Sequence, residues 1–96
     1  MQARTSTWTG SPEALDKWAE HVALNVQPMV AGLPGNAGAY FFIDRVNQRA
    51  LTLTLWATDA SARSSDETAD ASRARTVRAT GVELLERGSY DVVGSA

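Results

Sequence analysis

The 96-residue sequence contains no cysteine and a single histidine, His21. Without cysteine the chain can form no disulfide, use no thiolate nucleophile and hold no metal through sulfur. One histidine with no neighbouring cluster of histidines and carboxylates does not supply the ligands of a metal site. We therefore expect no metal site, and we also expect no cofactor.

Long hydrophobic runs are also absent, because no apolar stretch approaches the roughly 20 residues that span a bilayer. The opening residues Met1 to Arg4 lack the apolar core of a signal peptide, so we expect a cytoplasmic protein. The net charge is −2 and the isoelectric point is near 5.2. This weak acidity argues against strong attraction to nucleic acid or to an anionic membrane, and we expect neither as a partner.

The residues that are present are typical of a small globular protein. Hydrophobic residues make up 44% of the sequence, far more than in a disordered chain. A chain of this length buries enough apolar surface for one core. We expect residues 1–96 to form a single domain.

Hydrophobic periodicity predicts the order strand, helix, strand, strand, helix, strand. β-branched and aromatic residues place the strands at about 2–9, 39–44, 49–57 and 83–93. Ser11 and Pro12 form a helix start, as cap and first helical residue. The apolar residues that then recur at helical spacing are Leu15, Trp18, Val22, Val26, Met29 and Leu33. Pro28 interrupts this stretch and should kink the helix or divide it near Gln27.

The second helical region is expected over residues 59–80, with Gly81 as its stop. Ser64 to Glu67 match a capping box, which predicts a brief turn and then a longer helix from about residue 65. Asp66, Glu67 and Asp70 would then be acidic residues near the start of the helix, where the helix dipole stabilises negative charge. This helix offers few large apolar residues to a core.

The predicted order most often makes a four-stranded antiparallel sheet with both helices on one face. We therefore predict an α+β protein with the ferredoxin-like βαββαβ fold. The run from Tyr40 to Ile43 is apolar on both faces, and Leu51, Leu53 and Leu55 share one face of the next strand. An uncovered apolar sheet face usually marks an interface, so we predict a homodimer with paired sheets.

Several segments together resemble one known family. They are Thr7-Trp8, Leu33-Pro34-Gly35, the run from Leu53 to Ala60, and Tyr90-Asp91-Val92. Over nearly its whole length the chain resembles the antibiotic biosynthesis monooxygenase-like domains of the dimeric α/β-barrel superfamily. The resemblance implies a barrel formed by two sheets in a dimer.

The resemblance also allows a comparison with the residues that active members use. The heme-degrading branch uses an Asn on the first strand, a Trp at the end of the third and a His on the second helix. Trp56 matches that Trp, but the first strand has no Asn, and no His follows Trp56. The cofactor-free, quinone-forming branch places an Asn four residues before the same Trp, where this chain has Thr52.

Three residues are candidates for a catalytic role: Trp56, His21 and Tyr40. Trp56 could line a pocket for a flat aromatic ligand, with its N–H orienting a carbonyl, but we favour simple packing between sheet and helices. His21 is interpreted as a solvated helix residue rather than a general base. Tyr40, with Trp8 and Trp18, is expected in the core, although its hydroxyl could instead enter a cavity.

Three arginines of the second helical region, Arg73, Arg75 and Arg78, could bind an anion. We favour the helix terminus and Asp70 as their partners. Two hypotheses for function remain. The first is a non-catalytic dimer that binds a small aromatic or hydrophobic ligand. The alternative is a cofactor-independent monooxygenase acting on an aromatic or polyketide-like substrate, and the missing Asn and His favour the first.

Overall fold

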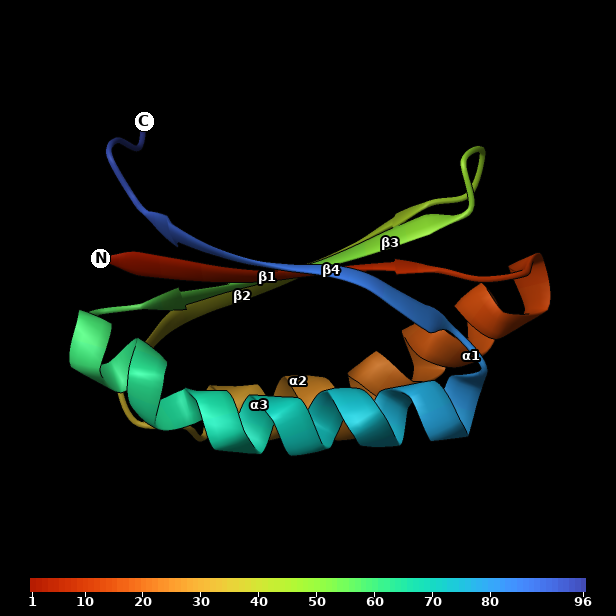
Figure 1. The fold of residues 1–96 in the computed structure, drawn as a ribbon, viewed down its shortest axis with the longest axis horizontal. Coiled ribbons are helices and arrows are strands. Elements are labelled where there is room, and N and C mark those ends of the chain that lie inside the picture. Colours follow the sequence, from red (N-terminus) through yellow and green to blue (C-terminus); the bar gives the residue numbers. More distant parts are fainter.

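The computed structural model describes all of residues 1–96 and shows one four-stranded sheet with its helices on a single face (Figure 1). The elements are β1 (Gln2–Thr9), α1 (Pro12–His21), the π-helical segment η1 (Val22–Val26), α2 (Gln27–Ala31), β2 (Asn36–Asp44), β3 (Arg49–Trp56), α3 (Asp59–Thr80) and β4 (Glu83–Asp91). This order confirms the predicted ferredoxin-like α+β fold. None of the helices combines the length and hydrophobicity that a membrane span requires.

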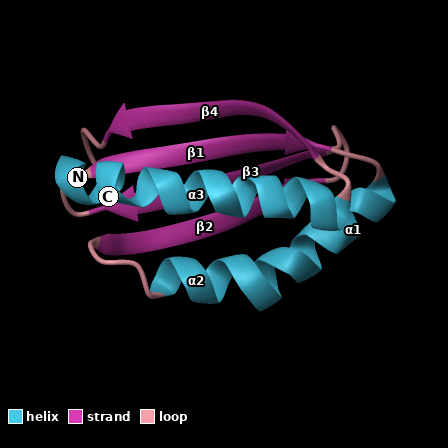
Figure 2. Cartoon of the chain, turned by 60° about the horizontal axis from the view of Figure 1, so that its bottom comes forward, coloured by secondary structure: helices cyan, strands magenta, loops and turns pink.

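The sheet is antiparallel throughout, with the strand order β2-β3-β1-β4. Figure 2 shows α3 lying over the middle of the sheet and α2 beside β2. On β1, Ser6 pairs with Thr52 of β3 and with Arg87 of β4. Directly paired residues share a face, so these three side chains lie on the side of the sheet that the helices cover.

The first helical region begins and divides as predicted. The Ser11 hydroxyl accepts a hydrogen bond from the Ala14 N–H at 3.1 Å, and Pro12 is the first helical residue. The helix then widens into η1, where the Gln27 N–H donates to the Val22 carbonyl instead of the next carbonyl along. Pro28, which has no N–H to donate, falls in the first turn of α2.

Helix α3 is continuous from Asp59 to Thr80, so the predicted turn before residue 65 is wrong. The cap is Thr58, whose hydroxyl accepts the Ser61 N–H at 3.1 Å. Ser64 lies inside the helix and donates its hydroxyl to the Ala60 carbonyl at 2.9 Å. Gly81 ends the helix in the left-handed region, with φ of 82°, as predicted.

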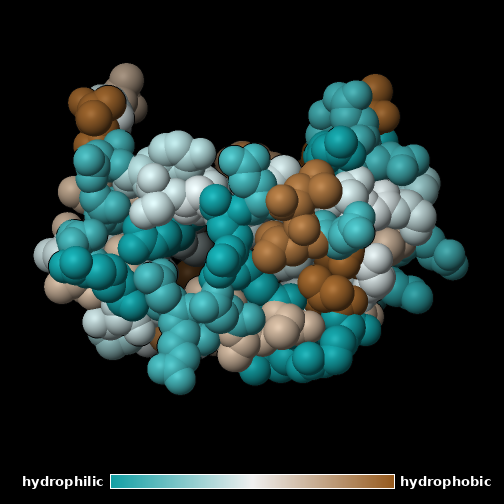
Figure 3. Space-filling view, in the orientation of Figure 1, coloured by the Kyte–Doolittle hydropathy of each residue, from teal (hydrophilic) through white to brown (hydrophobic).

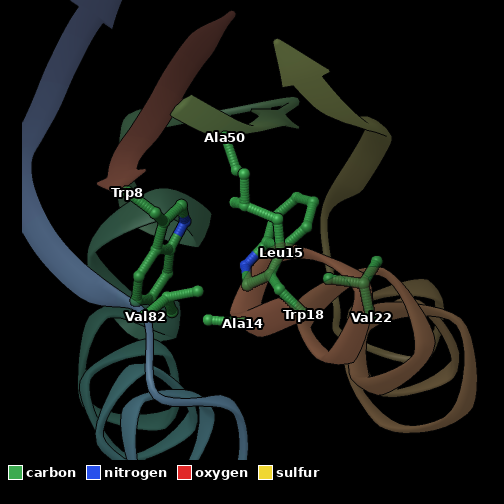
Figure 4. Close-up of a cluster of buried hydrophobic side chains, with 7 residues drawn as sticks. All are labelled: Trp8, Ala14, Leu15, Trp18, Val22, Ala50 and Val82. Atoms are coloured by element: carbon green, nitrogen blue, oxygen red, sulfur yellow. The ribbon is translucent and has the colours of Figure 1, made fainter. Parts of the chain in front are cut away.

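The hydrophobic core lies between α1, the sheet and the start of β4 (Figure 4). Its seven buried members are Trp8, Ala14, Leu15, Trp18, Val22, Ala50 and Val82. Burial of one large apolar side chain contributes about 1.5–3 kcal/mol. None of the seven belongs to α3, whose buried residues are Ala62, Ser65, Ser72, Thr76 and Thr80. Helix α3 therefore meets the sheet with small and hydroxyl-bearing side chains.

The other face of the sheet is not covered by any helix (Figure 1). Tyr40 and Phe42 stack there with ring centroids 6.2 Å apart, and they are 58% and 46% exposed. Leu53 pairs with Tyr40 and Leu51 with Phe42, so the β3 leucines share this face. The expected burial of Tyr40 in the core is wrong for this chain, because alternation points Phe41 toward the helices and Tyr40 away from them.

Candidate functional site

A cavity of about 410 Å³ lies between α3 and the sheet. Figure 3 shows a hollow between β4 and α3 that is surrounded by hydrophilic side chains. The volume falls within the range of roughly 300–1,000 Å³ that is usual for small-molecule sites. The cavity exists because the side chains on the inner face of α3 are too small to fill the space between the helix and the sheet.

One wall of the cavity is apolar. It is formed by six side chains from α1 to the loop after α2, namely Trp18, Val22, Val26, Met29, Val30 and Leu33. Five of them belong to the apolar stripe predicted from the sequence. That stripe continues past the buried core because η1 and α2 extend the helical path along the sheet.

The sheet and α3 contribute hydroxyl groups to the lining of the cavity. They come from three sheet residues and three α3 residues, namely Ser6, Thr52, Thr54, Ser65, Ser72 and Thr76. Thr76 donates to the Ser72 carbonyl at 2.9 Å, and Ser65 donates to the Ala62 carbonyl at 2.7 Å. Bonds to the preceding helical turn allow these hydroxyls to be buried without an unpaired donor.

Trp56 lies at the end of β3, lines this cavity and is only 2% exposed. Its indole N–H donates to the Thr54 hydroxyl at 3.0 Å. Likewise the indole N–H of Trp8 donates to the Thr52 hydroxyl at 3.2 Å. Trp56 is therefore almost fully packed where it meets the cavity, and its N–H is already engaged.

The polar rim is an arginine–aspartate cluster formed by β1, α3 and β4. Arg4 pairs with Asp66 at 3.3 Å, and Arg73 and Arg87 both pair with the same carboxylate, Asp70. The interpretation of Asp66 and Asp70 as acidic residues near the start of the helix is wrong, because α3 begins at residue 59 and places both of them further along the helix.

Asp70 is the carboxylate of this cluster that two arginines contact. The hydrogen bond from Arg73 lowers the pKa of Asp70, and the positive charges of Arg73 and Arg87 add to the effect. A partial sequence signal for the cluster existed: Asp66, Asp70 and Arg73 are spaced i, i+4, i+7 and so share a helix face.

The other two catalytic candidates lie away from this cavity. His21 is half-buried on the helix, with its Nδ1 3.3 Å from the Asn25 amide nitrogen, and it does not line the cavity. Tyr40 is on the uncovered sheet face and at the edge of a second groove, of about 610 Å³, between β2 and the α1–α2 region. The structure thus does not bring Trp56, His21 and Tyr40 together. No three His, Asp or Glu side chains are arranged to hold a metal ion.

Fold and cavity together define a class: a ferredoxin-like α+β protein with an amphipathic cavity between its single sheet and its helices. No protein-family model matches the sequence, and no curated protein matches it in sequence. Solved structures do match it in fold.

Three of these structures cover nearly the whole chain. A protein of Deinococcus radiodurans assigned to the antibiotic biosynthesis monooxygenases matches with a TM-score of 0.80 and 11% identity, covering 100% of this chain and 96% of the other. A monooxygenase from the gene ActVA-Orf6 of Streptomyces coelicolor, in complex with nanaomycin D, matches with a TM-score of 0.76 and 14% identity, covering 99% and 89%. SnoaB, a cofactor-independent oxygenase from Streptomyces nogalater, matches with a TM-score of 0.69 and 15% identity, covering 98% and 94%.

These similarities confirm the resemblance seen in the sequence. At 11 to 15% identity they establish that the chain has the fold of antibiotic biosynthesis monooxygenases.

Proposed function

We propose that the chain is a homodimeric small-molecule-binding protein whose cavity takes a flat aromatic or hydrophobic ligand. The observation that carries this proposal is the 410 Å³ cavity beside Trp56, which α3 leaves open by presenting small side chains. The ActVA-Orf6 structure holds nanaomycin D, which supports an aromatic ligand in a protein of this fold.

The lining of the cavity favours a particular kind of ligand. Trp18 and Trp56 lie in the lining with about 2% of their surface exposed, and with the aliphatic side chains around them they make this side apolar, which suits a flat ring system. The hydroxyl groups from the sheet and α3, such as those of Ser6 and Ser72, suit carbonyl and hydroxyl substituents. A ring system with oxygen substituents, as in polyketide-like molecules, satisfies both parts of the lining at once.

The uncovered sheet face supports the homodimer. Tyr40 and Phe42 of β2 are each about half exposed there, and Leu85 and Tyr90 are about half exposed on β4, the strand at the other edge of the sheet. Exposed apolar side chains of this kind on a sheet usually mark an interface. A second copy has the same surface, so two sheets packing face to face would bury it on both chains.

The alternative is a cofactor-independent monooxygenase, which the match to SnoaB favours. A bound phenolate or enolate would itself give electrons to oxygen, with one oxygen atom entering the product and the other leaving as water. The ionisable side chains that line the cavity are three arginines and two aspartates, with no His or Tyr. This set can hold an anionic substrate but contains no histidine to act as general base, so we place ligand binding first.

A titration of the purified protein with 1,8-dihydroxyanthraquinone, followed by tryptophan fluorescence, tests the proposal. Saturable quenching is expected, because Trp18 and Trp56 line the cavity. An oxygen electrode with anthrone as substrate tests the alternative, which requires oxygen uptake above the spontaneous rate. Absence of quenching by any flat aromatic compound would contradict the ligand-binding proposal.

A further inference from the structure

We propose that Arg4 and Arg73 form an anion subsite in the cavity, so that the ligand carries a carboxylate or a similarly acidic group on its aromatic body. The inference rests on the proposed ligand-binding function and names the chemistry of the ligand. Of the three arginines considered from the sequence, only Arg73 lines the cavity. Its partner in the subsite is Arg4 of β1, which lines the same cavity from the sheet.

The burial of the charged groups is uneven, and this sets the sign of the potential in the cavity. The side chains of Arg4 and Arg73 are each 19% exposed, whereas their partners Asp66 and Asp70 are 51% and 56% exposed. Water screens the aspartates at the rim, while the guanidinium groups are largely withdrawn from it. The cavity wall therefore carries a net positive field that favours an anion.

Asp70 already has a second partner, so Arg73 can bind a ligand without leaving an unpaired carboxylate. Arg87 donates to Asp70 from the β4 side at 2.8 Å. When an acidic ligand binds Arg73, Asp70 keeps its ion pair with Arg87. The cost that usually follows from breaking a charged pair is thus reduced.

Hydroxyl groups complete the subsite. Arg73 contacts the Ser6 hydroxyl at 3.5 Å, and Arg4 donates to the Ser89 hydroxyl. Each hydroxyl can in turn donate its proton to an anion, and each guanidinium has N–H groups beyond those used in these contacts. Arginine is suited to planar acids because its paired N–H groups match the two oxygens of a carboxylate.

The strand register fixes how far the acid lies from the aromatic wall. Arg4 pairs with Thr54, and Trp56 is two residues further along β3 on the same face. Such diagonal neighbours are about 7–8 Å apart in an antiparallel sheet. An acid attached directly to a ring system therefore reaches Arg4 while the rings lie against Trp56.

The test compares two probes of the same shape, anthraquinone-2-carboxylate and anthraquinone-2-carboxamide. Fluorescence titration of the wild-type protein is expected to show the carboxylate binding about ten- to hundredfold more tightly than the carboxamide. This factor corresponds to the free energy of hydrogen bonds between charged groups. Arg73→Gln and Arg4→Gln should each remove most of this preference while binding of the amide is kept. Arg75→Gln is the matched control, because Arg75 is exposed on the same helix and does not line the cavity.

The outcomes separate the subsite from the proposed function. Equal affinity for acid and amide in the wild-type protein would overturn the subsite and leave ligand binding intact. Failure of both probes to bind would overturn the proposed function and the subsite with it. If both glutamine variants still prefer the acid to the amide as the wild-type protein does, Arg4 and Arg73 are not the anion subsite. If Arg73→Gln does not fold, the wild-type comparison and Arg73→Lys, which keeps the charge but loses the paired donors, decide the question.

Discussion

The indole N–H of Trp56 donates to the hydroxyl of Thr54, two residues earlier on the same strand, at 3.0 Å. Thr54→Val keeps the shape of the side chain but removes the acceptor from a Trp that is 2% exposed. A buried donor left without a partner costs about 1–3 kcal/mol, and we expect the free energy of unfolding to fall by that amount. Urea denaturation followed by tryptophan fluorescence measures it.

Thr54→Ser is the control for this pair, because serine keeps the hydroxyl and loses one methyl group. That loss should cost no more than about 0.8 kcal/mol. If the valine and serine variants are equally stable, the hydrogen bond does not stabilise the fold.

The start of α3 can be tested with two hydroxyl deletions. Thr58→Ala removes the cap acceptor for the Ser61 N–H and should cost about 1 kcal/mol. Ser64→Ala removes only a bond to the carbonyl of the preceding turn and should be neutral or slightly stabilising, since alanine is the better helix former. Chemical denaturation of both variants checks the contrast. A larger loss for Ser64→Ala would support the shorter helix expected from the sequence.

Much of the fold could be predicted from the sequence because its periodic patterns are strong. The alternation from Leu51 to Trp56 and the helical stripe that begins at Leu15 each indicate one type of element. The start of α3 could not be predicted in the same way. Two cap-like sequences, at Thr58 and at Ser64, compete locally, and the structure uses the earlier one.

Only the part of the arginine–aspartate cluster that lies on α3 could be predicted from local pattern. Arg4 on β1 and Arg87 on β4 are far apart in the sequence, and they reach Asp66 and Asp70 only because β4 pairs with β1 beneath α3. The cavity escaped prediction for a related reason. The scarcity of large side chains in α3 was visible, but whether it meant loose packing or an open space depended on the position of the helix over the sheet.

Cavity size can be changed by one substitution on α3. Ala69→Leu places a larger side chain in the cavity and should weaken binding of 1,8-dihydroxyanthraquinone by at least about tenfold. Ala74→Leu is the matched control, because Ala74 is exposed on the same helix. Alanine and leucine are both good helix formers, so the stability of either variant should change little. Unaltered binding in Ala69→Leu would place the ligand outside this cavity.

The homodimer predicts a mass of about twice the 10.3 kDa of the chain in size-exclusion chromatography with light scattering. Phe42→Arg introduces a charge into the uncovered sheet face and should convert the dimer to a monomer. Val46→Arg, in the turn between β2 and β3 and 92% exposed, should remain dimeric. A wild-type monomer at micromolar concentration would contradict the paired-sheet arrangement.

The pH dependence of stability should report the ion pairs of Asp70. Its pKa lies below the ordinary value of 3.8 in the folded protein, so its ion pairs stabilise the fold at higher pH. This contribution is lost as the pH falls from about 3.8 through the folded pKa. The wild-type protein should therefore be more stable than Asp70→Asn near neutral pH, with the difference shrinking in acid. Urea midpoints measured across this range check it, and a constant difference would argue against the ion pairs.

Ala69, Ser72 and Thr76 all line the cavity from one face of α3. Because these three positions belong to one helix, single substitutions there can change the size and polarity of the ligand that the cavity accepts. No strand has to move, and the core around Trp8 and Leu15 is untouched. A lineage can therefore specialise its ligand while inheriting the same scaffold.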